Sequence, residues 1–323
     1  MKPAFSVIYL TTLIGAAQGL FLALFTHQSY ALFGLLPMQS EAFYGYGSVL
    51  ATLLLIGGLI ASFFHLGRPE RAWRTATQWR TSWLSREVIA LPAFMGLTVL
   101  YGFVHLSGYN PVVVTLPSGL HIDLSVVLGV LGTLMAFTLF VCTSMIYACL
   151  RFLREWHSPF TVINYILMGG ASGFTLAAFF AAVNAPSEAG FFAGWAIVIT
   201  LLAFVGRAAS LVRNARIKPK STMQTAIGVK HSHITQRTQG SMGGSFNTRE
   251  FFHGKSADFL RMIKPAFLML AFVVPLILLA FGVFTPVMLG FVFALQFVGL
   301  IAERWFFFAQ ANHPQNLYYQ TVG

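Results

Sequence analysis

The residues most able to do chemistry flank one short polar segment. His65 closes one apolar run, Glu87 opens the next, and residues 66–86 join the two. Apolar runs joined by a short turn are antiparallel neighbours, so we expect both side chains to lie at a similar membrane depth. Histidine is the side chain that titrates nearest to neutral pH, and desolvation favours the neutral, protonated form of a carboxyl group. The pair is therefore suited to handling protons at a membrane surface.

A quinone is a substrate that needs such groups. Its reduction takes two protons as well as two electrons, so its oxygens need titratable or hydrogen-bonding partners. The turn also contains tryptophans that would form an apolar wall for the ring, and ionisable residues at membrane depth are candidates for function. The sequence therefore suggests a quinone site at His65, Glu87, Trp73, Trp79 and Trp83.

Simpler roles for the same residues remain open. Glu87 would also be favourable at the positive end of its helix, paired with an arginine. His65 would serve as an interfacial cap, and the tryptophans as an aromatic belt at the lipid boundary. As an abstract pattern, one histidine and one glutamate beside several arginines are weak support for a quinone site.

The composition defines the elements that must position these residues. Of 323 residues, 57% are hydrophobic and 9% are charged, and the mean hydropathy is +0.73. A soluble domain carries about 25% charged residues, so the sequence excludes a soluble enzyme. Helices of about 20 apolar residues span a bilayer. We predict an all-α, polytopic membrane bundle of eight transmembrane helices, at about 7–27, 46–65, 87–106, 122–148, 162–183, 190–211, 266–284 and 286–308.

The positive charges predict how this bundle is oriented. With eight spans, all 20 Lys and Arg residues fall on one side, while the other side carries only Glu41, Asp123 and Glu188. Positively charged loops stay in the cytoplasm, so both termini are expected there. This bias also explains the net charge of +11 without nucleic-acid binding.

One long polar segment, 212–264, interrupts the apolar pattern. Loops of this length are either functional or disordered. It is interpreted either as a basic loop held near anionic lipid headgroups or as a docking surface for a cytoplasmic partner. The residues predicted to contact a partner come from this loop and from the 66–86 turn: Arg74, Arg80, Arg86, Phe246, Arg249 and Phe251.

Longer strings add a family resemblance. The segments HLGRPERAWR and QWRTSWLSREV, with QTAIGVKH and GGSFNTREFF in the long loop, resemble the membrane-anchor subunits of the DMSO reductase family (DmsC-like). The resemblance spans most of the chain and implies a complex with an iron–sulfur subunit and a molybdopterin catalytic subunit. The anchor would exchange electrons with the quinone pool, ubiquinone or menaquinone. The family's functional His and Glu fall on His65 and Glu87, and its Gly-Arg-Pro turn adds Gly67, Arg68 and Arg71 to the predicted quinone site.

The resemblance leaves the direction of electron flow open. Related anchors serve DMSO reductases, which oxidise quinol outside the cytoplasm, and cytoplasm-facing sulfite dehydrogenases, which reduce quinone. Because the charged turn and loop are both predicted to be cytoplasmic, the sulfite-oxidising type is favoured.

Other kinds of function are less well supported. A transporter would carry charged residues in the middle of its spans, and none is found there. A passive anchor without a quinone site remains an alternative. Cys142 and Cys149 form no cluster motif, so metal centres are assigned to the partner subunits. His27, His105 and His121 lie near the outer face, where a pair could hold a haem, but no haem is favoured.

Overall fold

The protein is a bundle of long helices. The computed structural model describes residues 3–218, 222–231, 233–234 and 255–313. Within these residues, eight helical segments are long and apolar enough to cross a membrane, which confirms the predicted number. They are α1 (Phe5–Leu32), α2 (Glu41–Phe63), α3 (Trp83–Ser107), α4 (Leu124–Ala148), α5 (Pro159–Asn184), α6 (Ala189–Ala215), the continuous α9–η3–α10 (Ala257–Leu268, Met269–Val273, Val274–Ala280) and α11 (Pro286–Ala309).

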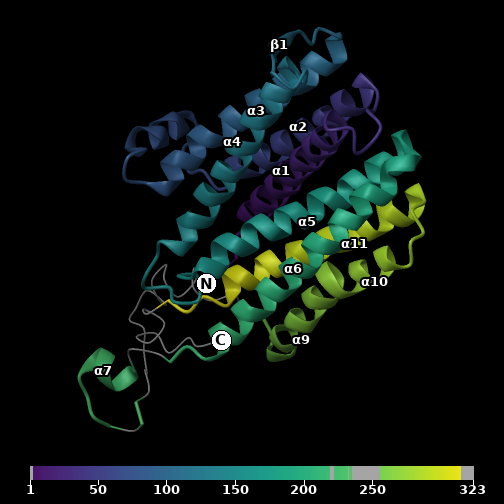
Figure 1. Ribbon diagram of the computed structural model, residues 1–323. Coiled ribbons are helices and arrows are strands. Elements are labelled where there is room, and N and C mark those ends of the chain that lie inside the picture. The colour runs from purple at the N-terminus through teal and green to yellow at the C-terminus, as the bar shows by residue number, and fades with distance from the viewer. Residues whose placement is uncertain (1–2, 219–221, 232, 235–254, 314–323) are drawn as a thin grey trace.

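Two helices form the centre of the bundle. Figure 1 shows α1 and α5 side by side, with α2, α3 and α4 on one side and α6, α9, α10 and α11 on the other. In both central helices, 72% of the most apolar stretch is buried, against 28–44% in the remaining spans. The outer helices therefore present most of their apolar surface to lipid, while α1 and α5 hold the two halves together.

The start of α3 differs from the prediction. The helix begins at Trp83 and not at residue 87, because the Ser82 hydroxyl accepts a hydrogen bond from the Ser85 backbone N–H at 3.3 Å. Such a serine cap satisfies one of the N–H groups that a helix start leaves free. Glu87 consequently lies one turn inside the helix, where its side chain is directed into the bundle.

The seventh span was predicted at 266–284, but in the structure it both begins and ends earlier, at Asp258–Ala280. Ser256 caps α9, whose first turns carry the exposed residues Asp258 and Arg261. The wider π turn η3 lies between Pro265 and Pro275, two residues that cannot donate a backbone hydrogen bond. The span ends at Ala280 because Gly282 then adopts a left-handed conformation, with φ of 71°.

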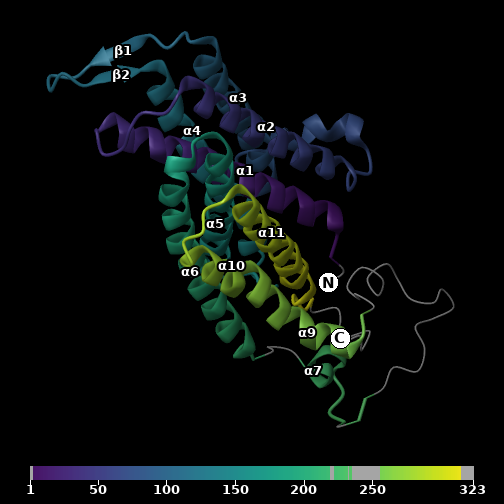
Figure 2. The ribbon, with the colours of Figure 1, turned by 90° about the vertical axis from the view of Figure 1, so that its right-hand side faces the viewer.

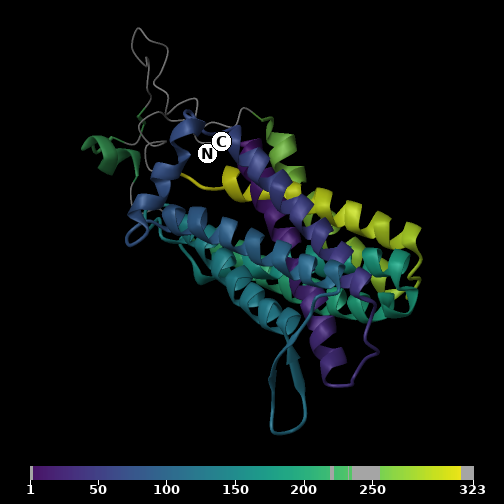
Figure 3. The same cartoon turned by 90° about the horizontal axis from the view of Figure 1, so that it is seen from above.

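The two ends of the bundle carry different connections. A two-stranded antiparallel hairpin, β1 (Val112–Thr115) and β2 (His121–Asp123), joins α3 to α4 and was not predicted. The turn between α2 and α3 contains the 3₁₀ helix η1 (Pro69–Gln78). The hairpin lies at the end of the molecule opposite η1, the N-terminus and α9 (Figures 2 and 3). Between α6 and α9, the described residues include the short helix α7 (Met223–Ile227).

Glycines allow α1 and α5 to approach closely. A Cβ on Gly173 of α5 would collide with the backbone of Gly19 and Leu20 in α1, and one on Gly19 would collide with the backbone of Gly169. Small residues permit this approach where lipid removes the hydrophobic force between helices. The glycine-rich string 169–173 therefore serves for close helix packing.

We predict that Gly173→Ala destabilises the protein by about 1–3 kcal/mol, because the added methyl group forces the central helices apart. The matched control is Gly96→Ala, since a Cβ at Gly96 of α3 meets open space. Thermal unfolding of the detergent-solubilised protein, followed by tryptophan fluorescence, should show a lower midpoint for Gly173→Ala alone. Equal midpoints for both variants would contradict close packing of α1 on α5.

Candidate functional site

The 66–86 turn is an exposed surface rich in arginine and tryptophan. His65, Gly67, Arg68, Arg71, Trp73, Arg74, Trp79 and Arg80 are exposed, whereas Trp83 and Arg86 are half-buried. His65 lies just beyond the end of α2, where partial desolvation lowers its pKa. Of the three predicted docking arginines of this turn, Arg74 and Arg80 are therefore accessible to a partner, and Arg86 is less accessible.

Each tryptophan of this turn lies beside an arginine. The guanidinium carbon of Arg74 is 5.5 Å from the Trp73 ring centre, that of Arg80 is 5.4 Å from Trp79, and that of Arg86 is 4.2 Å from Trp83. Arg86 also donates hydrogen bonds to the carbonyl oxygens of Trp79 and Arg80, at 2.9 and 2.8 Å. Arg86 thus fastens the end of the turn to the first turn of α3.

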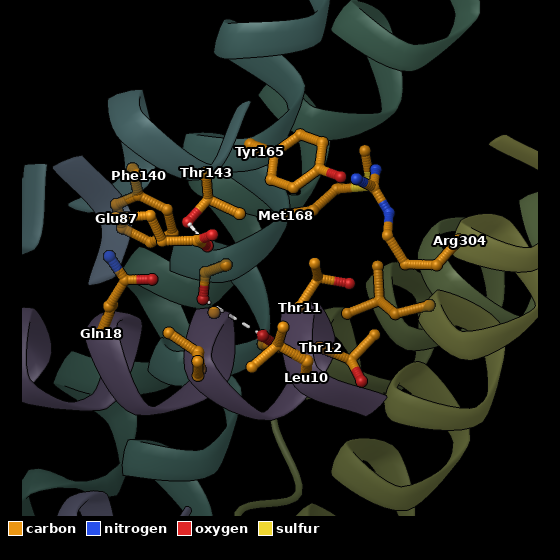
Figure 4. Close-up of a pocket in the computed structure, with 15 residues that line it drawn as sticks. Leu10, Thr11, Thr12, Gln18, Glu87, Phe140, Thr143, Tyr165, Met168 and Arg304 are labelled. Carbon is orange, nitrogen blue, oxygen red and sulfur yellow. Dashed lines mark hydrogen bonds between the residues drawn. The ribbon is translucent and has the colours of Figure 1, made fainter. Parts of the chain in front are cut away.

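Glu87 lies beneath this turn and is buried, with 8% of its surface exposed. The Thr143 hydroxyl of α4 donates a hydrogen bond of 2.5 Å to its carboxyl group. Figure 4 shows Glu87, Thr143, Gln18, Tyr165 and Arg304 around one small cavity between α1, α3, α4, α5 and α11. The carboxyl group is therefore held by the bundle interior and not by the arginines of the turn.

The cavity is polar but small. Its volume is about 30 Å³, and a site of this size holds about one water molecule. Glu87 is its one acidic lining residue and Arg304 its one basic lining residue. His65 is not among the lining residues, so the described structure does not bring the two predicted proton-handling side chains together in one cavity. The arrangement is suited to storing or passing a proton through water.

Arg304 belongs to a buried charge cluster that sequence reasoning missed. Glu303 pairs with Arg207 through one carboxyl oxygen, at 2.7 Å, and with Arg304 through the other, at 2.6 Å. All three side chains are at least 94% buried. The Arg304 guanidinium also lies 4.2 Å from the Tyr165 ring centre. The predicted spans 190–211 and 286–308 already contained Arg207 and Arg304, but we counted both arginines only among the positive charges of one membrane side; the structure buries them inside α6 and α11. One feature of the sequence could have indicated this cluster: Glu303 and Arg304 are adjacent charged residues within an apolar run.

A second, larger recess lies on the other face of the α3–α4 pair. This groove, about 610 Å³ in volume, is lined by Trp79, Trp83, Arg86, Ile89, Ala90, Ala93, Leu134, Met135, Phe137, Thr138, Val141 and Cys142. It therefore includes two of the predicted quinone-site tryptophans and one predicted docking arginine. Glu87 does not line it.

The histidines near the hairpin end are engaged in hydrogen bonds. The buried His27 bonds the Tyr44 hydroxyl at 2.9 Å through Nδ1 and the Glu188 carboxyl at 3.0 Å through Nε2. His105 pairs with Glu41, and His121 bonds the Thr115 hydroxyl at 3.0 Å. In His27, both ring nitrogens are occupied in holding α1 to neighbouring elements. No group of three or more His, Cys, Asp or Glu residues in the described part of the chain is arranged to hold a metal ion.

Three of the predicted partner contacts, Phe246, Arg249 and Phe251, lie outside the described residues. Of the 212–264 loop, the structure describes both flanks and the short helix α7. Arg154 donates a 2.5 Å hydrogen bond to the backbone oxygen of Lys218, which ties the start of this loop to the connection between α4 and α5.

Two comparisons with known proteins bear on this geometry. Residues 1–309 match the family described as DMSO reductase anchor subunit (DmsC). The chain is also 53% identical, over 327 aligned residues, to a subunit of the sulfite dehydrogenase of Allochromatium vinosum, and the alignment covers 100% of both chains. Both the cavity and the groove lie within the matched residues.

We predict that Glu303→Gln strongly destabilises the protein, by about 3–5 kcal/mol, because it leaves two buried arginines without their counter-charge. The control is Glu70→Gln, which removes an exposed partner of Arg71, and such exposed pairs contribute only about 0–1 kcal/mol. Thermal unfolding of the two purified variants would measure the difference. Wild-type stability of Glu303→Gln would contradict a structural role for the cluster.

Proposed function

Because the chain belongs to the DMSO reductase anchor subunit (DmsC) family, we propose that it is the quinone-reactive anchor of an oxidoreductase complex. Membership itself makes it a multi-pass membrane subunit of a multi-subunit oxidoreductase. The proposal adds that it holds an iron–sulfur subunit, and through it a molybdopterin catalytic subunit, at the membrane. Electrons then pass between the iron–sulfur subunit and the quinone pool.

The observation that carries this proposal is the buried carboxyl group of Glu87. An ionisable group surrounded by protein at membrane depth is costly and is a candidate for function. Here the carboxyl group accepts a hydrogen bond from the Thr143 hydroxyl and lines a cavity with room for water. A quinone that accepts two electrons also takes up two protons, and Glu87 is placed to hold one of them. His65, at the exposed end of α2, would exchange protons with the aqueous side.

The exposed turn supplies the contact surface for the partner. Arg68, Arg71, Arg74 and Arg80 are exposed, and their positive charge suits an acidic face of the iron–sulfur subunit. Electrons would therefore arrive above the residues that handle protons. Gly67 and Trp73 belong to the same surface, where they would guide the approach of both partner and quinone.

Sulfite is the favoured electron source. The full-length similarity to a sulfite dehydrogenase subunit supports a complex that passes electrons from sulfite to quinone. The family description on its own would also suit a quinol-oxidising complex of the DMSO reductase type. Parallel assays with sulfite and with DMSO separate the two.

The charge distribution supports a cytoplasmic position for the partner subunits. The arginine-rich turn and the N-terminus lie at one end of the bundle, and Lys and Arg mark the cytoplasmic side. We predict that a green fluorescent protein fused to the C-terminus fluoresces and that alkaline phosphatase at the same place is inactive. Alkaline phosphatase inserted at residues 117–119, between β1 and β2 in the hairpin, should be active. The reverse pattern would place the partner subunits outside the cytoplasm.

We predict that Glu87→Gln lowers sulfite-to-quinone electron transfer in membranes by about 10²-fold or more, the usual contribution of a proton-transferring group. His65→Ala should lower the same rate. Dye-linked sulfite oxidation, which bypasses the anchor, should stay at the wild-type level in both variants. The control is Glu70→Gln, which removes an exposed carboxyl group from the same turn.

Two outcomes would count against the proposal. Full quinone-linked turnover in both variants would mean that the anchor passes no protons through these residues. Quinone-linked turnover that is absent from the wild-type complex, while dye-linked activity is present, would mean a passive anchor.

A further inference from the structure

The cavity at Glu87 cannot itself hold a quinone ring. At about 30 Å³ it is far below the roughly 300–1,000 Å³ of ligand pockets. The groove between α3 and α4, at about 610 Å³, lies within that range. We propose that the quinone binds in this groove, with its ring against Trp83 and its tail along the apolar residues of α3 and α4. This inference rests on the proposed function, which it extends by placing the substrate.

The groove has one polar end and one apolar end. Trp79, Trp83 and Arg86, from the end of the 66–86 turn, form the polar end of the groove. Deeper along the helices the walls are mainly apolar, and Ile89, Leu134 and Phe137 are 47%, 61% and 42% exposed on the outer surface of the bundle. A quinone matches this distribution, because its ring carries two polar carbonyl oxygens and its isoprenoid tail is apolar. The tail would enter from the lipid without crossing a polar barrier.

The polar end suits a neutral carbonyl group better than a phosphate. Arg86 is the charged residue that lines the groove, and it donates hydrogen bonds to two backbone carbonyls of the protein's own turn. Its guanidinium also lies against the Trp83 ring. Trp79 and Trp83, whose indole N–H groups are neutral donors, line the same end of the groove. The aromatic faces beside them offer a stacking surface for a flat ring.

The groove and the Glu87 cavity share one wall. Along α3, Arg86 lines the groove and the next residue, Glu87, lines the cavity. Along α4, Cys142 lines the groove and the next residue, Thr143, lines the cavity and bonds Glu87. Adjacent residues of a helix point to neighbouring faces, so the carboxyl group lies directly behind the groove wall. The quinone and its proton reservoir are thus separated by a single pair of helices.

The test fills the groove from each wall. Ala93→Phe on α3 and Thr138→Phe on α4 place a ring inside it, because both residues line the groove. The matched controls are Val99→Phe and Leu131→Phe on the same helices, at residues that are 49% and 46% exposed and do not line the groove. Assays use the whole complex in membranes with a short-chain quinone. Each groove variant should raise the KM for quinone by about tenfold or more, with little change in dye-linked activity. Wild-type KM values in an assembled groove variant would overturn the proposal.

A second measurement leaves the wild-type sequence intact. A photoreactive quinone analogue is activated in the native complex, and its attachment points are mapped by mass spectrometry. Attachment within residues 79–93 or 134–142, suppressed by excess unmodified quinone, supports the groove. Suppressible attachment confined to other segments overturns it, even where the groove variants fail to assemble.

The outcomes also separate this proposal from the one on which it rests. If Glu87→Gln abolishes quinone-linked turnover while both groove variants behave as wild type, the anchor is quinone-reactive and the groove is wrong. If a groove variant loses a tightly bound phospholipid but keeps its KM for quinone, the groove is a lipid site and the proposal is overturned. If the wild-type complex shows no quinone-linked turnover, both proposals fail.

Discussion

The structure depends on one constraint: lipid offers no hydrogen bonds, so polar groups inside the spans must find partners within the bundle. The strongest response to this constraint is Glu303, whose two oxygens each hold a buried guanidinium, from Arg207 and from Arg304. This cluster joins α6 to α11. Its two arginines exceed its one glutamate by one positive charge, and the Phe267 and Tyr165 rings lie against the two guanidinium groups. It also positions Arg304 at the edge of the cavity that Glu87 lines. The same requirement that stabilises the helices thus builds the polar interior on which the proposed chemistry relies.

Two faces of the α3–α4 pair divide the proposed chemistry between them. The interior face holds the proton-handling carboxyl group, fixed by Thr143 in a cavity with room for water. The outer face offers an apolar recess open towards lipid. Above both, Arg86 ties the arginine-rich turn to α3. A partner bound on the turn would therefore lie close to the quinone in the groove. The protons would reach the quinone from Glu87, on the interior side of the same two helices.

The helices could be predicted from the sequence because each is a continuous apolar run. Glu87 was also identifiable as an ionisable residue at membrane depth. The residues around its carboxyl group, Gln18, Thr143, Tyr165 and Arg304, were not predicted, because they come from α1, α4, α5 and α11. Helices that are apolar on all sides carry no strong periodic signal to show which face points inward. The separation of His65 from the cavity was missed because the Ser82 cap, and not the glutamate, begins α3.

Whether this chain connects an iron–sulfur partner to quinone is tested most directly by a single-turnover measurement. The partner's clusters are reduced with sulfite in the complete complex, and their reoxidation after mixing with quinone is followed by electron paramagnetic resonance. We predict rapid reoxidation in the complete complex and clusters that stay reduced when the anchor is absent. Equal reoxidation rates with and without the anchor would contradict the proposed role.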